Sequence, residues 1–238
     1  MRNIWTISAK ELRSYLSSPM AYVVTAIFLV LSGTFFSSYL AGTRYSDTSL
    51  RGFLSVAQYL ILLFSAVLSM RLVAEERKLG TWELLLTVPV RDVEIIVGKF
   101  LGSLAVLAGM LALTLYYPVL LVVFGDPDIG PIFTSYVGLV LLGSASLAVG
   151  VFASSLTSNQ LVSAVFAGGL LFALWFLGAV AGFAPGGLAE LLSYLSLSAH
   201  FPDFIRGIID TKALVYYVSV TSIFLFLAVR STEADRWA

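Results

Sequence analysis

The feature that most limits how this chain can fold is a set of long runs without Asp, Glu, Lys or Arg. Five such runs occur in the 238 residues, at 14–43, 52–70, 100–125, 129–189 and 213–229. A helix that crosses about 30 Å of hydrocarbon needs about 20 mostly apolar residues, and each run is close to or beyond that length. Only 12% of the residues are charged, whereas a soluble helix bundle needs charged outer faces. The sequence therefore predicts an all-α membrane protein.

The run 129–189 contains 61 residues, which is too long for a single crossing. The polar segment 156–160, which reads LTSNQ, divides it, because polar side chains can satisfy the backbone groups freed at a hairpin. We therefore expect one domain over residues 1–238 with six spans. Their approximate positions are 20–40, 53–73, 98–124, 133–155, 161–183 and 213–230.

The basic residues are distributed unevenly between the two ends of these spans. Six spans place both termini on one side, together with Arg2, Lys10, Arg13, Arg71, Arg77, Lys78, Arg91, Lys99, Arg230 and Arg236. The other side has only Arg44, Arg51, Arg206 and Lys212. Cytoplasmic loops carry the excess of Lys and Arg. We therefore expect a multi-pass protein of the cell (cytoplasmic) membrane whose termini both lie in the cytoplasm.

The segment 2–17, before the first span, has the pattern of a helix that lies on the membrane surface. On a helical wheel one face has Trp5, Ala9, Leu12, Tyr15 and Leu16, and another has Arg2, Lys10 and Arg13. This separation of apolar and basic faces is typical of interfacial helices. We expect Ser17-Ser18-Pro19 to end this helix before the first span begins.

The segment 184–212 on the opposite side begins with a strong helix breaker, Ala184-Pro185-Gly186-Gly187. Two short amphipathic stretches follow it. The first has Leu188, Leu191, Leu192 and Leu195 at helical spacing, and the second has Phe201, Phe204, Ile205 and Ile208. Neither is long enough to span a membrane, so we expect two short helices that dip into the outer leaflet or lie on it.

The loop 74–97 between the second and third spans is charged and amphipathic. It begins with Glu75, Glu76, Arg77 and Lys78. Gly80 then permits a turn, and Thr81 can cap a following helix whose apolar face has Leu79, Trp82 and Leu86. Such a helix can bury its apolar stripe against a partner protein or against lipid headgroups, and these residues alone leave both alternatives open.

Small residues four positions apart occur at Gly98/Gly102 and Gly178/Gly182. This spacing lets two helices approach closely. We expect both pairs to pack helices within one subunit.

Most chemical functions lack their residues in this sequence. A phosphate-binding P-loop needs G-x-x-x-x-G-K-[ST], but Val93 replaces the first glycine before Gly98-Lys99 and Phe100 replaces the Ser or Thr. The chain is therefore not expected to be an enzyme or to bind a cofactor, and Lys99 is expected to anchor a span end at the level of the lipid phosphates. Cysteine is absent and His200 is the only histidine, so no catalytic residues and no metal site are predicted. The net charge of zero gives no reason to expect a nucleic-acid partner.

Residues 75–90 read EERKLGTWELLLTVPV, and residues 95–100 read IIVGKF. This stretch resembles the signature of type-2 ABC exporter permeases; Arg91-Asp92 depart from it, because a serine-like residue is expected there. The chain end resembles a subgroup that includes the permeases linked to gliding motility and to nitrous-oxide-reductase maturation. The positions concerned are His200, Phe201, Phe204, Arg206, Gly207, Asp210, Tyr216, Tyr217, Ser219, Arg236 and Trp237.

The resemblance implies that two permease copies, identical or related, pair within the lipid membrane and that each binds a separate ATPase subunit, which holds the ATP and magnesium. ATP-driven closure of the ATPases would push a cytoplasmic coupling helix and open the path between the two permeases. By the same resemblance, that helix and its docking end comprise Glu75, Glu76, Arg77, Leu79, Gly80, Thr81, Trp82, Glu83, Leu84, Leu85 and Leu86. The competing hypothesis is a membrane scaffold subunit without transport. Neither substrate nor direction can be predicted from these residues.

Overall fold

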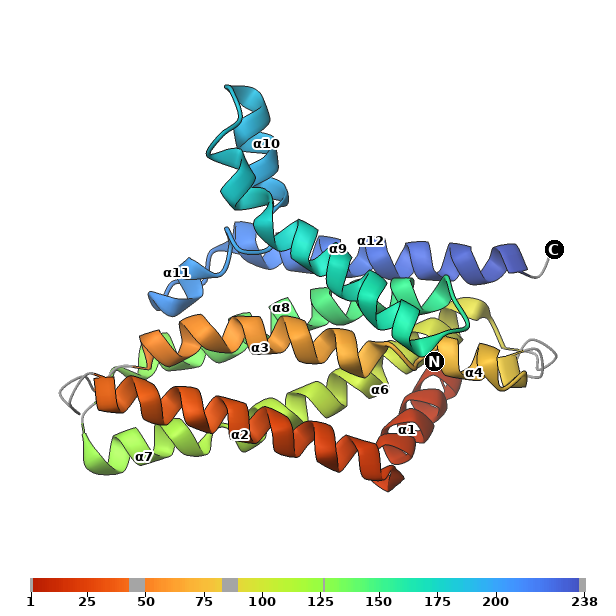
Figure 1. Cartoon of the computed structure of the whole chain (residues 1–238), viewed down its shortest axis with the longest axis horizontal. Helices are drawn as coiled ribbons and strands as arrows, with labels where there is room; N and C mark the ends of the chain where they lie inside the picture. Colours follow the sequence, from red (N-terminus) through yellow and green to blue (C-terminus); the bar gives the residue numbers. More distant parts are fainter. Residues whose placement is uncertain (1, 43–49, 83–89, 126, 236–238) are drawn as a thin grey trace.

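The computed structural model describes residues 2–42, 50–82, 90–125 and 127–235, which are mostly helical and contain no strand (Figure 1). The helices are α1 (Arg2–Ser17), α2 (Pro19–Gly42), α3 (Arg51–Ser69), α4 (Ala74–Lys78), α6 (Asp92–Leu113), α7 (Tyr116–Phe124), α8 (Ile129–Ser155), α9 (Gln160–Ala181), α10 (Gly187–Leu195), α11 (Pro202–Ile205) and α12 (Thr211–Asp235).

Six of the helical stretches in the described part of the chain are long and apolar enough to cross a membrane. They are Pro19–Gly42, Arg51–Lys78, Asp92–Phe124, Ile129–Ser155, Gln160–Ala181 and Thr211–Ala234. Each overlaps one of the six expected spans, so the predicted fold class is confirmed.

The helix boundaries follow from local chemistry at the expected breaks. The helix α1 ends at Ser17 and α2 begins at Pro19, which is suited to a first helical position because its missing N–H needs no partner there. Between α8 and α9, the side chain of Asn159 accepts hydrogen bonds from the backbone N–H groups of Leu161 and Val162. The polar segment 156–160 is therefore the hairpin that separates the fourth and fifth spans, as the sequence predicts.

The third span, expected as one continuous helix over 98–124, is interrupted near Thr114. Pro118 has no N–H to donate, and its ring would clash with the carbonyl of Thr114 in a regular helix. Instead, the backbone N–H of Tyr117 donates to Thr114 O at 3.0 Å, and the Thr114 hydroxyl donates to Leu111 O at 2.7 Å. The span consequently consists of two helices, α6 and α7.

The helix α8 forms the centre of the bundle, where it packs against α3, α6, α9, α11 and α12. Three of its glycines allow this, because a Cβ atom at Gly138, Gly143 or Gly150 would collide with a different neighbour. A Cβ at Gly138 would lie 2.7 Å from the Phe204 ring, and one at Gly143 would lie 2.5 Å from Leu107. One at Gly150 would collide with Ser69. Small residues thus bring three neighbouring elements close to one helix.

The helices α9 and α10 pair in a hairpin that projects from the bundle (Figure 1). The turn between the two helices contains the expected Pro185-Gly186 breaker. Gly186 adopts a φ of 52°, a conformation that glycine tolerates. The four leucines of the first outer stripe all lie on α10; Leu188, Leu191 and Leu195 are exposed and Leu192 is half-buried, and their contact with the outer leaflet stays a prediction.

The second expected outer helix is wrong in two respects: its length, and what its apolar side chains contact. The helix α11 is a single turn, and Gly207, at a φ of 92°, follows it, so Ile208 is not on the same helix as Phe204. Phe201 and Phe204 are fully buried within the chain, Ile205 is half-buried and Ile208 is exposed. The close approach of Phe204 to Gly138 of α8 explains the difference, because it places the phenylalanines in the protein core instead of in lipid.

Candidate functional site

The candidate site lies at the end of the bundle that carries both termini (Figure 1). It is formed where α1, α4 and α6 meet, beside the segment 74–82 that the sequence singled out. The short helix α4 follows the second span almost directly, after a turn at residues 70–73. Any movement of α4 must therefore be transmitted to the surrounding helices through this turn or through side chains.

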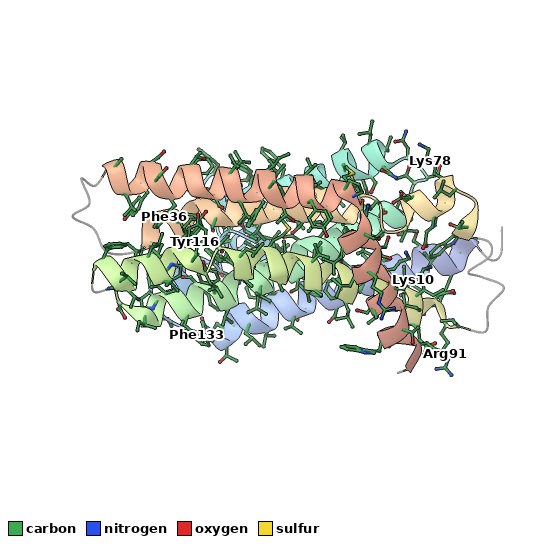
Figure 2. The ribbon with its side chains drawn as sticks, turned by 90° about the horizontal axis from the view of Figure 1, so that it is seen from below. Lys10, Phe36, Lys78, Arg91, Tyr116 and Phe133 are labelled. Atoms are coloured by element: carbon green, nitrogen blue, oxygen red, sulfur yellow. The ribbon has the colours of Figure 1, made fainter. Side chains whose placement is uncertain are left out.

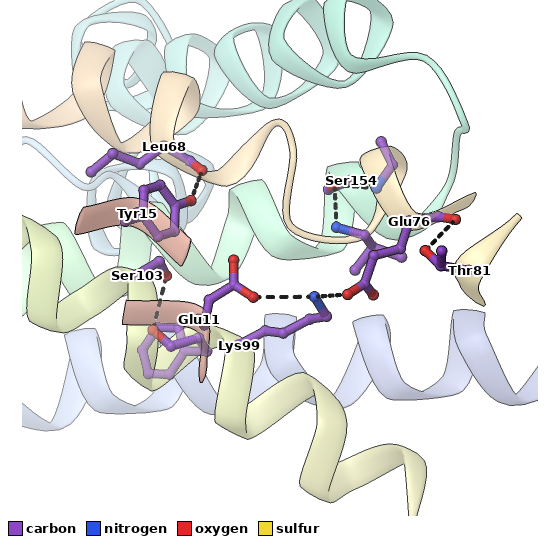
Figure 3. A network of polar contacts seen from close by, with 11 residues as sticks. Glu11, Tyr15, Leu68, Glu76, Thr81, Lys99, Ser103 and Ser154 are labelled. Atoms are coloured by element: carbon purple, nitrogen blue, oxygen red, sulfur yellow. Dashed lines mark hydrogen bonds and ion pairs between the residues drawn. The ribbon is translucent and has the colours of Figure 1, made fainter. Parts of the chain in front are cut away.

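Lys99 of α6 is the central residue of the site. Its side chain is only 3% exposed, and its Nζ lies 2.8 Å from Glu76 Oε1 of α4 and 3.4 Å from Glu11 Oε2 of α1 (Figure 3). The two carboxylates are themselves largely buried. One ammonium group therefore links α4 and α6 to α1, which is far from both in the sequence.

The expectation that Lys99 anchors a span end at the lipid phosphates is wrong. Its ammonium group points into the protein because two carboxylates are placed to receive it there, which offsets the cost of taking a charge out of water. The second oxygen of Glu76, Oε2, is buried and has no hydrogen-bond partner in the described part of the chain. Glu76 thus faces the interior of the site and is not a freely exposed docking charge.

Tyr15 provides a second connection from α1. Its hydroxyl donates to the Leu68 carbonyl oxygen of α3 at 2.6 Å, and the Arg71 guanidinium lies 4.0 Å from the centre of its ring. Burial, and secondarily the negative charge of Glu11, raises the pKa of the Tyr15 phenol. The hydroxyl accordingly remains protonated, and able to donate, well into the alkaline range.

Ser154 of α8 fixes the turn between α3 and α4. Its Oγ accepts hydrogen bonds from the backbone N–H groups of Val73, at 3.1 Å, and Ala74, at 3.0 Å, and donates to Met70 O at 3.2 Å (Figure 3). All these residues are buried. The start of α4 is therefore attached to the central helix of the bundle by one hydroxyl group.

The helices α1 and α6 run in the same direction and contact each other at four-residue intervals. The Asn3 amide donates to Glu94 Oε2 at 3.1 Å. One helical turn later a Cβ at Gly98 would lie 2.8 Å from Ile7, and after another turn a Cβ at Gly102 would lie 2.7 Å from Glu11. The pair Gly98/Gly102 therefore packs helices within the subunit, as expected, although its partner is α1 and not another span.

Leu79 and Trp82, the two described residues of the predicted apolar stripe, do not share one face. Gly80 has a φ of 69° and separates α4 from the helical backbone that begins at Thr81. As a consequence Leu79 is 66% exposed whereas Trp82 is 5% exposed. The predicted stripe joining these two residues is therefore wrong. The predicted residues Glu83, Leu84, Leu85 and Leu86 lie outside the described part of the chain.

Trp82 and its neighbours connect the exposed turn to the interior. The Arg77 guanidinium lies 6.0 Å from the centre of a Trp82 ring, and the Thr81 hydroxyl donates to Glu76 O at 3.3 Å. Trp82 Nε1 is buried and has no hydrogen-bond partner among the described residues. On the outside, Lys78, Leu79, Gly80 and Thr81 form an exposed turn, which we call the 78–81 turn.

Aromatic side chains gather at the opposite end of the bundle, where Phe36 and Tyr116 lie (Figure 2), and one group of them surrounds His200. Its ring stacks on Tyr216 with 4.0 Å between ring centres, and its Nδ1 lies 3.1 Å from Ser196 O. This contact fits a structural role for the histidine. Among the described residues no group of three or more His, Asp or Glu side chains is placed to hold a metal ion.

Sequence reasoning missed Glu11, Lys99 and Ser154 as functional candidates. A signal existed for Glu11, because it is an acidic residue on a third face of α1, between the apolar and basic faces. Lys99 also begins a long uncharged run, where a buried ammonium group requires an acidic partner. Which acidic residue is the partner depends on tertiary contacts.

A comparison with protein families finds one match that covers nearly the whole chain. The family model, described as ABC-2 family transporter protein, matches residues 5–230. A search of curated proteins gave no match.

Proposed function

Because the chain belongs to the ABC-2 family of transporter proteins, we propose that it is the permease subunit of an ATP-binding cassette exporter, active as a dimer and driven by separate ATPase subunits. The family match supports a permease subunit, and the family implies an ATPase partner. The geometry of the Lys99 site supports the further proposal that the ATPase docks on the cytoplasmic 78–81 turn.

The 78–81 turn has the surface that a docking partner needs. Lys78, Leu79 and Thr81 are exposed at its surface, and Leu79 presents an apolar side chain that is 66% exposed. Trp82, directly behind the turn, has a buried Nε1 that lacks a hydrogen-bond partner in the described part of the chain. An apolar anchor beside polar groups is typical of the centre of a protein interface.

Movement of the docked turn would reach the membrane spans by two routes. One route is the Glu76–Lys99–Glu11 contact, which joins α4 to α6 and α1. The other is the Ser154 hydroxyl, which holds the start of α4 against α8. The Lys99 contact is the observation that carries this proposal, because it ties the docking segment to two further helices at once. An ATPase that binds two arrangements of α4 unequally would shift the permease between two states.

The path for the substrate would form between two copies of the chain. An apolar groove of about 400 Å³ lies between α3 and α9, and its wall includes the ring pair Tyr59–Trp175. No charged residue lines this groove. This lining favours an apolar or amphipathic cargo, and it would be completed by the second copy.

The experiment that tests the docking proposal is co-purification of the permease with its ATPase. Leu79→Asp places a charge in the apolar anchor, so we expect loss of the ATPase from the purified complex and loss of transport. The matched control is Arg230→Asp, which introduces the same residue at an exposed position at the same end of the protein. It should leave the complex intact, since surface ion pairs such as Arg230–Glu233 contribute little.

Two outcomes would refute the docking proposal. The first is a Leu79→Asp complex that retains its ATPase and hydrolyses ATP as the unmodified complex does. The second is an equal loss of ATPase in Leu79→Asp and Arg230→Asp, because that result would show no special role for the turn.

A further inference from the structure

A second groove, distinct from the one between α3 and α9, lies beside the Lys99 site between α1, α2 and α6. It has a volume of about 390 Å³ and is lined by apolar atoms from all three helices. Leu12 and Leu16 contribute from α1, Ala21 from α2, and Gly109 and Met110 from α6. The groove therefore lies where the first helix meets two spans, at the end of the bundle that carries the termini.

The polar side chains of the groove already have their hydrogen bonds within the protein. The Tyr15 hydroxyl donates to Leu68 O, the Tyr22 hydroxyl to Leu16 O at 2.7 Å, and the Thr25 hydroxyl to Ala21 O at 2.8 Å. Tyr15, Tyr22 and Thr25 are the hydroxyl-bearing residues of the lining. A ligand in the groove would thus meet hydrocarbon and hydroxyl groups that are already paired, which suits an alkyl chain and disfavours a polar molecule.

One basic side chain lies next to the groove. Arg13 is three residues before Leu16, which lines the groove, so the two are neighbours on the surface of α1. The Arg13 side chain is exposed and forms no ion pair with another described residue. The acidic residue of this helix, Glu11, is occupied by Lys99. An apolar groove with a cation beside it matches an acyl chain attached to an anionic headgroup.

We propose that this groove binds one anionic phospholipid, with an acyl chain between α1, α2 and α6 and the headgroup phosphate at Arg13. The lipid would fill the space between the second half of α1 and residues 105–113 of α6, next to the contact of Glu11 with Lys99. Occupation of the groove would in this way stabilise the Lys99 site. The proposal concerns lipid binding alone and does not depend on the ATPase or on transport.

Gly109 provides a direct test, because a Cβ atom at this position would meet no atom within 4 Å. Gly109→Phe should therefore fill the groove without disturbing the fold. The control is Gly169→Phe, since Gly169 lies on α9, outside both this groove and the one between α3 and α9, and also has nothing within 4 Å. The proteins are purified in mild detergent, and bound lipid is counted by native mass spectrometry after titration with phosphatidylglycerol or phosphatidylcholine.

We expect the unmodified protein and Gly169→Phe to retain one phosphatidylglycerol in preference to phosphatidylcholine, and Gly109→Phe to lose it. Arg13→Gln should weaken phosphatidylglycerol binding about fivefold, as expected for one basic residue near an anionic lipid. Lys78→Gln, which removes an exposed charge at the same end but outside the groove, should leave binding unchanged.

Three results would overturn the proposal. Equal retention of phosphatidylglycerol by Gly109→Phe and Gly169→Phe would show that the lipid binds elsewhere. Equal retention of both lipids by the unmodified protein would show that no anionic headgroup is recognised. Unchanged binding in Arg13→Gln would exclude the proposed headgroup contact, and this variant gives an answer even if Gly109→Phe does not fold.

Discussion

Lys99 Nζ lies 2.8 Å from Glu76 Oε1, although Lys99 belongs to the third span and Glu76 to the short helix α4. The contact is buried, and Glu11 of α1 approaches the same ammonium group. A buried ion pair of this kind adds little to stability compared with apolar packing, but it is costly to break on one side. Its effect is to make the positions of α1, α4 and α6 depend on one another.

Removal of the ammonium group should therefore destabilise the protein strongly. Lys99→Met leaves Glu11 and Glu76 buried without a cation, and we expect a loss of about 3–5 kcal/mol in the free energy of unfolding. Thermal unfolding in detergent, followed by circular dichroism, measures the effect. The control Lys78→Met removes an exposed lysine and should change stability by less than about 0.5 kcal/mol. Similar melting curves for the two variants would contradict the role assigned to Lys99.

The close contact of α1 with α6 should not tolerate a larger residue at Gly102. In Gly102→Val the Cβ would lie 2.7 Å from Glu11 Cβ and 3.1 Å from Ser8 O, so α1 must move away. Overpacking of this kind typically costs about 1–3 kcal/mol. Gly109→Val on the same helix has free space around its Cβ and should be tolerated. Limited proteolysis of α1 would distinguish the variants, and equal protection of α1 in both would refute the prediction.

Loss of the Ser154 hydroxyl should loosen the start of α4. Ser154→Ala leaves the buried N–H groups of Val73 and Ala74 without an acceptor, at a cost of about 1–3 kcal/mol for each unsatisfied group. We expect faster hydrogen exchange at these two amides. Ser146→Ala is the control, because the Ser146 hydroxyl donates only to Leu142 O of its own helix. Unaltered exchange at residues 73 and 74 would show that Ser154 does not fix the turn.

Single cysteines can test the proposed orientation, because the native chain contains none. Thr81→Cys and Ser158→Cys are exposed positions at the end that carries the termini, whereas Arg206→Cys lies at the opposite end of the spans. In intact cells an impermeant maleimide should label only Arg206→Cys, and cell lysis should expose the other two. Labelling of Thr81→Cys before lysis would place the proposed docking turn on the wrong side of the membrane.

The sequence predicted the spans well because their signal is local. Uncharged runs, the breakers at Pro19 and Pro185, and the polar hairpin at 156–160 each determine a boundary without help from distant residues. The interruption near Thr114 had a visible cause in Pro118 but was not predicted, since proline is often tolerated in membrane helices.

The contacts of the candidate site could not be predicted in the same way. Glu76 belongs to the loop recognised from sequence, but its partner Lys99 and the third residue Glu11 come from segments whose contact depends on the packing of α1 across α6. The burial of Phe201 and Phe204 likewise depends on a glycine of α8. Periodicity identifies an apolar face, but it does not tell whether protein or lipid covers that face.

The N-terminal helix α1 contacts α6 at regular intervals, with Asn3, Ile7 and Glu11 against Glu94, Gly98 and Gly102. This spacing restricts how α1 can move along α6. If α1 slid along α6 by a fraction of a turn, side chains of α1 would collide with the α6 backbone. The next position at which the two helices fit is a full turn away, roughly 5.4 Å. Sliding is therefore a jump between discrete positions. For smaller displacements α1 and α6 must move together, so the tilt of α1 follows the tilt of the third span.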